Sequence, residues 1–230
     1  KNISLKSLES ETKEVFTGAP EVALDFDGSG DYVDCGNDES LNITDAITIG
    51  AWIKRTGTGG NYQHIVSKFR SSQAWLLGLY QGYEFIIVNE SGVRKDLRPG
   101  GITVTNGAWY HYVGTYDGFI MKGYINGIDI GSSMIQSGKI KTTSSLLNLG
   151  GNPNLPSDFF KGQISDVRIY DRALSAEEVE QLYKGYDIRN GLVGHWPLNE
   201  GQCTIAYDRS GNGNDGILLP AIDGPTWTTK

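Results

Sequence analysis

Two short stretches of this chain carry oxygen-bearing side chains at a spacing that suits a bound calcium ion. Each alternates three oxygen donors before a glycine, as in Asp25-x-Asp27-x-Ser29-Gly30 and Asp208-x-Ser210-x-Asn212-Gly213. The twelfth positions are Gly36 and Leu219 rather than the bidentate glutamate of an EF-hand, which excludes that class of site. Calcium accepts carboxylates and backbone carbonyls in other loops as well. The alternative is that these carboxylates only cap turns.

Carboxyl groups in the arrangement of a glycoside hydrolase are absent from the sequence. Such an enzyme needs two of them across a cleft, and alternate residues of one strand would present them together. The sequence has no run of alternating carboxylates of this kind, and Glu84 and Glu90 merely bracket an apolar stretch. The three histidines accompany neither a nucleophile elbow nor a phosphate-binding loop: His64, His111 and His195. We therefore expect a protein that is not an enzyme.

Residues 62–94 have the mixture of side chains that sugar binding requires. An aromatic ring packs on the apolar face of a sugar, and amide, carboxylate or guanidinium groups bond its hydroxyls. Trp75 follows a polar loop rather than an alternating apolar strand, so it is the predicted platform, with Tyr62 second. The alternative for any of these rings is a place in the core, which we expect for Trp52, Trp109 and Trp196. The other predicted ligand-binding residues are Tyr80, Tyr83, Asn89 and Arg94.

These residues must be positioned by strands, because short apolar runs separated by turn clusters dominate from residue 22 onward. In Ala46–Lys54 the apolar side chains alternate, which predicts a strand with one buried face. Asn126-Gly127 lies between two apolar runs and predicts a two-residue hairpin turn. One helix is expected near 175–184, where Ser175 and Glu178 form a capping box and Gly185 ends the pattern.

Bulk composition limits the classes of partner. The 230 residues include 38% hydrophobic side chains, enough for a substantial core. A formal net charge of −7 argues against nucleic acid, whose phosphates require clustered Lys and Arg. No apolar run approaches the ~20 residues of a membrane span, so we expect no membrane insertion. Two cysteines are too few for a zinc-finger set.

Two motifs resemble the laminin-G-like family of concanavalin A-type sandwiches. The first is Ala-Leu-Asp-Phe-Asp-Gly-Ser-Gly-Asp-Tyr-Val at 23–33, and the second is Gly-Gln-Ile-Ser-Asp-Val-Arg-Ile-Tyr-Asp-Arg-Ala-Leu at 162–174. The resemblance implies an all-β jelly-roll sandwich of two antiparallel sheets with one short helix. It covers most of the chain, and its motifs are specific for fold but poor for ligand.

The end of the chain departs from the family's order. The segments at 191–201 and 207–216 resemble the opening of a laminin-G-like domain, yet here they follow the helix. Residues 191–227 either complete the sheets in permuted order, begin a truncated second copy, or complete a neighbouring chain. We expect the first, because residues 23–185 alone would leave unpaired edges. The predicted organisation is a polar arm or edge segment at 1–21 and a single sandwich at 22–227.

The resemblance also implies a metal site and a disulfide. Many relatives hold one structural calcium near the Asp-Gly loop, which points to Asp27, the Gly28 carbonyl and Asp166. Relatives often carry Asp where this chain has Ser165. If the C-terminal segment folds back, Cys203 would lie near Cys35, and a disulfide between them would stabilise the fold by ~4–5 kcal/mol. A pair of free thiols is the alternative.

The expected function is that of a non-catalytic, lectin-like carbohydrate-binding module of a secreted or surface protein, stabilised by calcium. Its partner would be a glycan or polysaccharide, bound weakly by loops. The second hypothesis is an adhesion module that binds a protein surface, as many laminin-G-like domains do. A glycoside hydrolase is the third. The resemblance implies an extracellular location.

Overall fold

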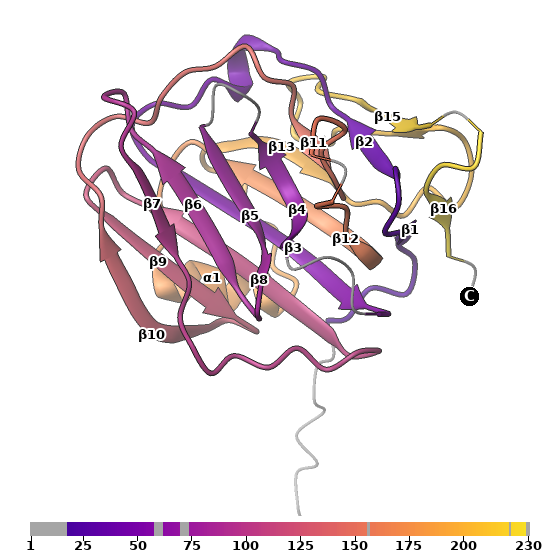
Figure 1. The fold of residues 1–230 in the computed structure, drawn as a ribbon, viewed down its shortest axis with the longest axis horizontal. Coiled ribbons are helices and arrows are strands. Elements are labelled where there is room, and N and C mark those ends of the chain that lie inside the picture. The colour runs from indigo at the N-terminus through magenta and orange to yellow at the C-terminus, as the bar shows by residue number, and fades with distance from the viewer. Residues whose placement is uncertain (1–17, 58–61, 70–73, 156, 221, 229–230) are drawn as a thin grey trace, which may run out of the picture.

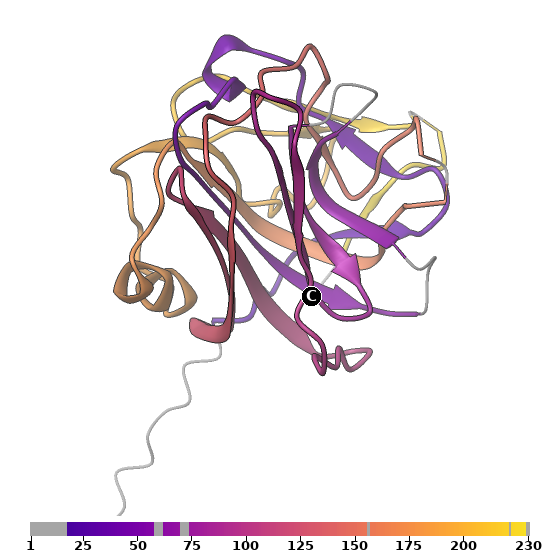
Figure 2. The ribbon, with the colours of Figure 1, turned by 60° about the vertical axis from the view of Figure 1, so that its left-hand side comes forward.

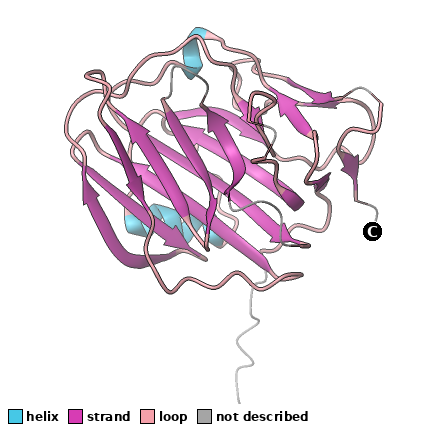
Figure 3. Ribbon diagram, viewed as in Figure 1, coloured by secondary structure: helices cyan, strands magenta, loops and turns pink. Residues whose placement is uncertain are grey.

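The computed structural model describes residues 18–57, 62–69, 74–155, 157–220 and 222–228. In this part of the chain two eight-stranded sheets lie face to face, and neighbouring strands pair antiparallel (Figure 1). Strand makes up most of the regular structure, as Figure 3 shows, beside one α-helix and one short 3-10 helix. The predicted jelly-roll-type β-sandwich is confirmed. Most of the expected polar arm, residues 1–17, lies outside the described residues.

The first sheet, here called sheet A, has the strand order β10-β9-β8-β3-β12-β1-β16, and β13 also pairs with β12. Its strands are β1 (Leu24–Asp27), β3 (Ile47–Arg55), β8 (Trp109–Tyr116), β9 (Ile120–Ile125), β10 (Ile128–Ile135), β12 (Lys161–Tyr170), β13 (Leu192–Trp196) and β16 (Thr226–Trp227).

The second sheet, sheet B, has the order β14-β15-β2-β11-β4-β5-β6-β7. Its strands are β2 (Tyr32–Asp34), β4 (Tyr62–Lys68), β5 (Trp75–Tyr80), β6 (Glu84–Val88), β7 (Arg94–Leu97), β11 (Asn148–Leu149), β14 (Ile205–Ala206) and β15 (Gly216–Leu219). The 3-10 helix, η1 (Glu39–Leu41), follows β2.

The main core lies between the sheets and follows from period-two patterning. The alternating side chains of β3 are fully buried, as the sequence predicts: Ile47, Ile49, Ala51 and Ile53. They meet the inward side chains of sheet B, such as Leu77 and Phe85. The predicted hairpin turn is also confirmed, because Asn126 and Gly127 have φ values of 53° and 77° between β9 and β10.

The helix α1 (Ala176–Tyr183) lies on the outer face of sheet A, as the turned view in Figure 2 shows. Its capping box is formed: Glu178 N–H donates to Ser175 Oγ, and the Ser175 N–H donates to Glu178 Oε2. Val179 and Leu182 pack in a second cluster with Tyr170 of β12. Among the described residues, no helix has the length and apolar character needed to cross a membrane.

The C-terminal segment contributes strands to both sheets. In sheet A, β13 pairs with β12 and β16 pairs with β1, while in sheet B, β15 pairs with β2. Trp196 is fully buried in the main core, and its indole N–H donates to the Asn214 carbonyl at 2.8 Å. The segment from residue 191 onward thus supplies the edge strands that residues 23–185 lack.

The second calcium-like loop is a set of turn caps. The Asp208 carboxylate accepts backbone N–H groups from His195, Ser210 and Asn214 at 2.8–2.9 Å. The Ser210 hydroxyl donates to the same carboxylate. These donors occupy both oxygens of Asp208, so this loop follows the alternative interpretation of the spacing, in which the carboxylate fixes turns.

The predicted disulfide is wrong, because both cysteines are free. Cys35 directly follows β2, and Cys203 precedes β14, with β15 between these two strands. Two strand spacings amount to about 9.5 Å, beyond the ~7 Å between Cα atoms that a disulfide spans. Cys35 is buried, which raises the pKa of its thiol, whereas Cys203 is exposed.

The shared core predicts that a cavity in the C-terminal segment destabilises the whole sandwich. We expect Trp196→Ala to lower the free energy of unfolding by about 3–5 kcal/mol, the usual cost of truncating a buried tryptophan. Urea denaturation followed by circular dichroism measures this. The control is Tyr186→Ala, whose ring is 62% exposed and should change stability by about 0.5 kcal/mol or less. A tail that folded independently would instead give a separate transition.

The cysteine environments predict two different reactivities. In the native protein a thiol reagent should modify one cysteine quickly, namely the exposed Cys203, and Cys203→Ser should abolish this fast phase. Cys35 should react only after denaturant is added. Absorbance of the released chromophore counts the thiols. If the denatured protein had no reactive thiol in the absence of reductant, Cys35 and Cys203 would not be free thiols, and the predicted disulfide would be correct.

Candidate functional site

A hollow of about 240 Å³ lies on the outer face of sheet B, between strands β4 and β7 and the loop that precedes β12. We call it the sheet-B hollow. Aromatic, charged and aliphatic side chains line it: Tyr62, His64, Phe69, Glu84, Ile86, Arg94, Leu155 and Asp158. Small-molecule sites generally combine apolar walls with a few placed polar groups, and this lining has both.

Strand register creates the floor of this hollow. His64 of β4 is paired with Gly78 of β5, and Gly78 with Glu84 of β6. Their neighbours Leu77, Leu79 and Phe85 are buried in the main core, so this row faces outward. Gly78 has no side chain there, and a Cβ atom would lie 2.7 Å from the Gln63 carbonyl oxygen. The Gln63 carbonyl and the Leu76 side chain thus occupy the space that a side chain at residue 78 would need, and Gly78 places no side chain between the two polar groups.

Glu84 is a buried carboxylate held by one arginine. Its side chain is 1% exposed, and Oε1 accepts N–H groups from Nε and Nη2 of Arg98, the former at 2.7 Å. Oε2 has no hydrogen-bond partner in the described part of the chain. Burial raises the pKa of Glu84, and the hydrogen bonds and charge of Arg98 oppose this. Arg98 also contacts Asp96, at 3.0 Å.

His64 is the second buried polar group of the floor. It is 3% exposed, and burial, assisted by the charge of Arg94, lowers its pKa to about 3. The imidazole is therefore neutral at physiological pH. Its Nε2 lies 3.7 Å from Asp158 Oδ2, while no described residue hydrogen-bonds to Nδ1.

Stacked rings form one wall of the hollow. Tyr62 and Tyr80 are cross-strand neighbours whose ring centroids lie 4.7 Å apart at an interplanar angle of 23°. The Arg98 guanidinium lies 4.6 Å from the Tyr80 ring and 5.5 Å from the Tyr62 ring. Arg94 covers Phe69 at 5.2 Å. Cation–π contacts of this kind hold long side chains in place, so the wall is rigid.

The structure brings together three of the six predicted ligand-binding residues. Tyr62 and Arg94 line the hollow, and Tyr80 stacks behind Tyr62. Trp75 was predicted as the exposed platform and is only 1% exposed. It is the first residue of β5 and packs inward with Leu77 and Leu79. The platform prediction for Trp75 is therefore wrong.

Tyr83 and Asn89 have structural roles instead of the predicted binding roles. Tyr83 is fully buried, stacks on Tyr112 with centroids 5.4 Å apart, and donates its hydroxyl to the Val113 carbonyl. Asn89 uses its amide to fix loops: Nδ2 donates to Ser137 O, and Oδ1 accepts from Val93 N, both at 2.9 Å. Neither side chain is free to meet a ligand.

Sequence reasoning missed the floor of the hollow. His64, Glu84, Arg98 and Asp158 received no binding role, although Glu84 stands out as a lone acid beside an apolar strand. The spacing of Tyr62 and His64, two residues apart on one strand, was the available signal, because such residues share a face. Asp158 comes from a loop about 95 residues later, and its pairing depends on the fold.

The predicted calcium ligands do not form one site. Asp27 is paired with Lys161, while Asp166 lies five residues further along β12, about 16 Å away at the strand rise of ~3.3 Å per residue. Asp27 Oδ1 caps the turn at Gly28 by accepting from Ser29 N at 2.6 Å. In the described ranges no group of three or more His, Cys, Asp or Glu side chains could hold a metal ion. These residues do not fit the implied ion.

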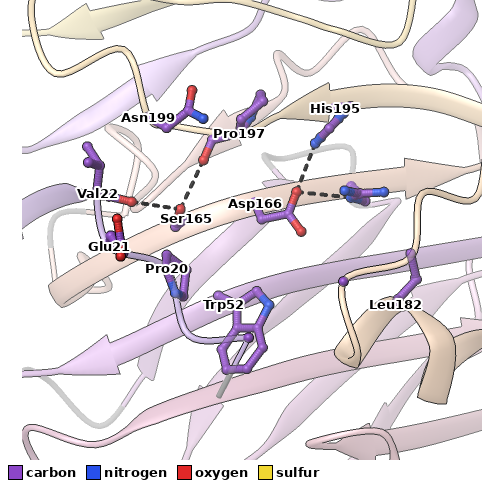
Figure 4. Close-up of a pocket in the computed structure, with 13 residues that line it drawn as sticks. Pro20, Glu21, Val22, Trp52, Ser165, Asp166, Leu182, His195, Pro197 and Asn199 are labelled. Atoms are coloured by element: carbon purple, nitrogen blue, oxygen red, sulfur yellow. Dashed lines mark hydrogen bonds and ion pairs between the residues drawn. The ribbon is translucent and has the colours of Figure 1, made fainter. Parts of the chain in front are cut away.

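Asp166 lines a larger hollow of about 580 Å³ on the outer face of sheet A (Figure 4). Its Oδ1 lies 2.8 Å from His195 Nε2 and accepts from Arg168 Nε at 2.9 Å. Burial alone would raise the pKa of Asp166, but the His195 hydrogen bond and the Arg168 charge lower it to about 2. Arg168 is in turn bonded to Asp187 at 3.1 Å.

The bonds around this hollow join separate parts of the chain. The Ser165 hydroxyl lies 3.1 Å from Val22 O and 2.9 Å from Pro197 O, and Asp166 N–H donates to the same Pro197 carbonyl. Asp166 has a φ of 44° where the register between β12 and β3 shifts. This arrangement fastens β13 and the segment before β1 to β12, which is a structural role. The sheet-B hollow is therefore the candidate binding site.

Solved structures share this fold at low sequence identity. A Bacteroides ovatus protein described as carbohydrate binding superposes with a TM-score of 0.69 at 17% identity, over 90% of this chain and 59% of that one. Domain 4 of an extracellular GH43 arabinanase from Geobacillus stearothermophilus, in complex with arabinotriose, gives 0.55 at 21% identity, over 70% and 76%. The receptor binding domain of botulinum neurotoxin D gives 0.56 at 21%, over 70% and 43%.

One curated relative and one family profile match the sequence itself. Mouse (Mus musculus) pappalysin-1 is 25% identical over 179 residues, which are 70% of this chain and 11% of that protein. The chain thus spans about a ninth of that relative. The laminin G profile described as the concanavalin A-like lectin/glucanases superfamily matches residues 27–180. With the motifs at 23–33 and 162–174 and the sandwich above, this match shows that the chain belongs to the concanavalin A-like lectin/glucanases superfamily.

Proposed function

We propose that this chain is a non-catalytic carbohydrate-binding module of a secreted or surface protein, and that the sheet-B hollow is its site. The row His64–Gly78–Glu84 carries the proposal. It places two buried polar side chains on one face of sheet B, and each has a polar atom without a partner in the described chain. A buried polar atom without a partner costs about 1–3 kcal/mol. Both atoms are closed off from water, so a sugar hydroxyl would satisfy them once a lining side chain moves aside.

The aromatic wall beside this row could pack against the apolar face of a sugar ring. The Tyr62 ring is held by Tyr80 and Arg98, and it offers a rigid apolar surface next to the polar floor. Structural neighbours support the proposal at the level of fold, since they include a protein described as carbohydrate binding and a domain solved with arabinotriose. Fold alone does not assign function, so the lining carries more weight.

The Glu84–Arg98 pair supports a binding role rather than hydrolysis. Glu84 and Asp158 are carboxyl groups of one hollow, as a hydrolase would need. However, Arg98 directs two N–H groups at one oxygen of Glu84 and holds the side chain in place. Burial raises the pKa of Glu84, and the Arg98 hydrogen bonds oppose this. We therefore propose that Glu84 serves as a fixed hydrogen-bond acceptor.

A protein partner is the second candidate function. Receptor binding domains are among the structural neighbours. Phe119 is 54% exposed and Ile135 is 65% exposed, and they lie near each other because Gln136 N–H donates to Phe119 O. Exposed apolar side chains at the β9–β10 edge are a feature of protein contact surfaces. This edge belongs to sheet A and is separate from the sheet-B hollow.

Glycan binding should depend on Tyr62. On a glycan array, and then by calorimetry with the best glycan, we expect Tyr62→Ala to weaken binding about two- to twelvefold, the range of an aromatic contact of ~0.5–1.5 kcal/mol. Tyr186→Ala is the control, because its ring is exposed and does not line the hollow. Chelator should leave binding unchanged, since the described residues around the hollow include no group of three or more His, Cys, Asp or Glu side chains that could hold a metal ion.

Two results would count against this assignment. Equal affinity of Tyr62→Ala and the native protein would remove the sheet-B hollow as the site. A lack of binding to every glycan on the array would favour a protein partner. Phe119→Ser and Ile135→Ser would then be the variants to test against captured proteins.

Removing Arg98 should make stability depend on pH. Arg98→Met leaves the buried Glu84 charge unpaired, and we expect a loss of about 3 kcal/mol near pH 7. The folded-state pKa of Glu84 is already raised and would rise further. A raised folded pKa favours the native state at low pH, so the loss should shrink as the pH falls toward 4. Urea denaturation between pH 4 and 8 measures it.

The double variant Glu84→Gln with Arg98→Met is the matched control, because its neutral amide does not titrate. Its stability should vary with pH no more than that of the native protein. A pH-independent loss in the single variant would show that Glu84 is not the buried charge that Arg98 compensates.

A further inference from the structure

We infer that the sheet-B hollow selects a single sugar residue without negative charge, and that it rejects uronic, sialic and sulfated sugars. This inference rests on the proposed glycan-binding function and names the class of sugar. It follows from the occupancy of the two arginines, from the sign of the lining charge, from the type of the unpartnered atoms and from the size of the hollow.

Within the described ranges, the two guanidinium groups near the hollow are already engaged by carboxylates. Arg94 donates Nε and Nη2 to the two oxygens of Asp96 at 2.6 and 2.9 Å. Arg98 bonds Glu84 and lies 3.0 Å from Asp96. A guanidinium recognises an anion through such paired N–H groups. An acidic sugar would have to displace an internal carboxylate to obtain them.

The net charge around the hollow also disfavours an anion. Three carboxylates, those of Glu84, Asp96 and Asp158, face two guanidinium groups within a small volume. His64 adds no charge, because burial lowers its pKa to about 3. Like charges a few ångströms apart repel strongly at the low effective dielectric of a partly buried site. A carboxylate or sulfate brought into the hollow would meet Asp158, and the described residues that line it supply no guanidinium that is free of a carboxylate.

The unpartnered atoms of the floor call for donors. Glu84 Oε2 is a carboxylate oxygen and only accepts hydrogen bonds. The neutral His64 ring carries one proton; its Nε2 lies 3.7 Å from Asp158 Oδ2, and no described residue hydrogen-bonds to its Nδ1. Sugar hydroxyls donate to a carboxylate oxygen such as Glu84 Oε2, and so does the ammonium group of an amino sugar. A carboxylate or sulfate group placed there offers acceptors alone and would leave Glu84 Oε2 unpaired.

The size of the hollow limits how much of a glycan enters. Its volume of about 240 Å³ lies below the ~300–1,000 Å³ of sites for drug-sized ligands. Tyr62, Phe69 and Leu155 are among the side chains that line it. This space suits one ring rather than an extended chain. The remainder of an oligosaccharide would lie over the rim.

Matched pairs of glycans test the inference. The probes are galactose and galacturonic acid oligosaccharides of the same linkage, and mannose and mannuronic acid oligosaccharides likewise, together with neutral and amino-sugar members of an array. In each pair that binds, we expect the acidic member to bind at least tenfold more weakly by calorimetry. Shortening the neutral oligosaccharide to a methyl glycoside should change the affinity less than threefold.

Asp158→Asn separates charge from shape. This variant removes one carboxylate from the rim, and we expect it to bind the acidic member of a pair at least threefold more tightly than the native protein does. Asp45→Asn is the control, since Asp45 is exposed and lies outside the hollow. It should leave the ratio between neutral and acidic members unchanged.

The outcomes distinguish this inference from the function on which it rests. An acidic member that binds as tightly as its neutral partner, or an unchanged ratio in Asp158→Asn, would overturn the selectivity while leaving glycan binding intact. A native protein that binds no member of any pair and no other glycan would overturn the proposed function itself. Loss of binding on shortening to the methyl glycoside would overturn the single-residue site.

Discussion

The pairing of β12 with three strands is the constraint on which the sandwich depends. One edge of β12 pairs with β3 along most of its length. The other edge is shared, because β1 pairs with residues 161–164 and β13 with residues 167–170. Asp166 lies where one partner gives way to the other, and its positive φ turns the carboxylate toward His195 and Arg168. The positive φ at Asp166 thus marks the position on β12 where pairing changes from β1 to β13.

The strand pairing of sheet B places particular polar side chains next to each other on its outer face. Each strand of the β4–β6 row contributes one outward residue, and the glycine in the middle separates two polar side chains. The acid needs its arginine because a buried unpaired charge is strongly destabilising. That arginine also holds the tyrosine pair in place. Stability and ligand recognition therefore depend on the same few contacts.

The sequence predicted what local patterns determine. Alternation in β3, the Asn126-Gly127 turn and the Ser175 capping box are short-range signals, and the structure has all three. The sequence-based prediction was wrong for Trp75, because a polar loop before a strand does not indicate whether the first residue of that strand faces the core or the solvent. Predicting the site would have required the strand register, because a shift of one residue would turn Glu84 inward. The predicted cysteine pairing failed because it depended on strand order: β15 lies between β2, which precedes Cys35, and β14, which follows Cys203.

The interleaving of the chain ends has a consequence for biosynthesis. Ala23 N–H bonds to Thr228 Oγ1, a contact that closes a loop of 205 residues. Contacts of such long range slow folding, because chain entropy is lost before they form. During synthesis, β1 and β2 would have unpaired edges until β16 and β15, their partners in the C-terminal segment, have been made. We therefore expect the domain to reach its native state only after residue 228 has emerged from the ribosome, with a requirement for chaperone protection until then.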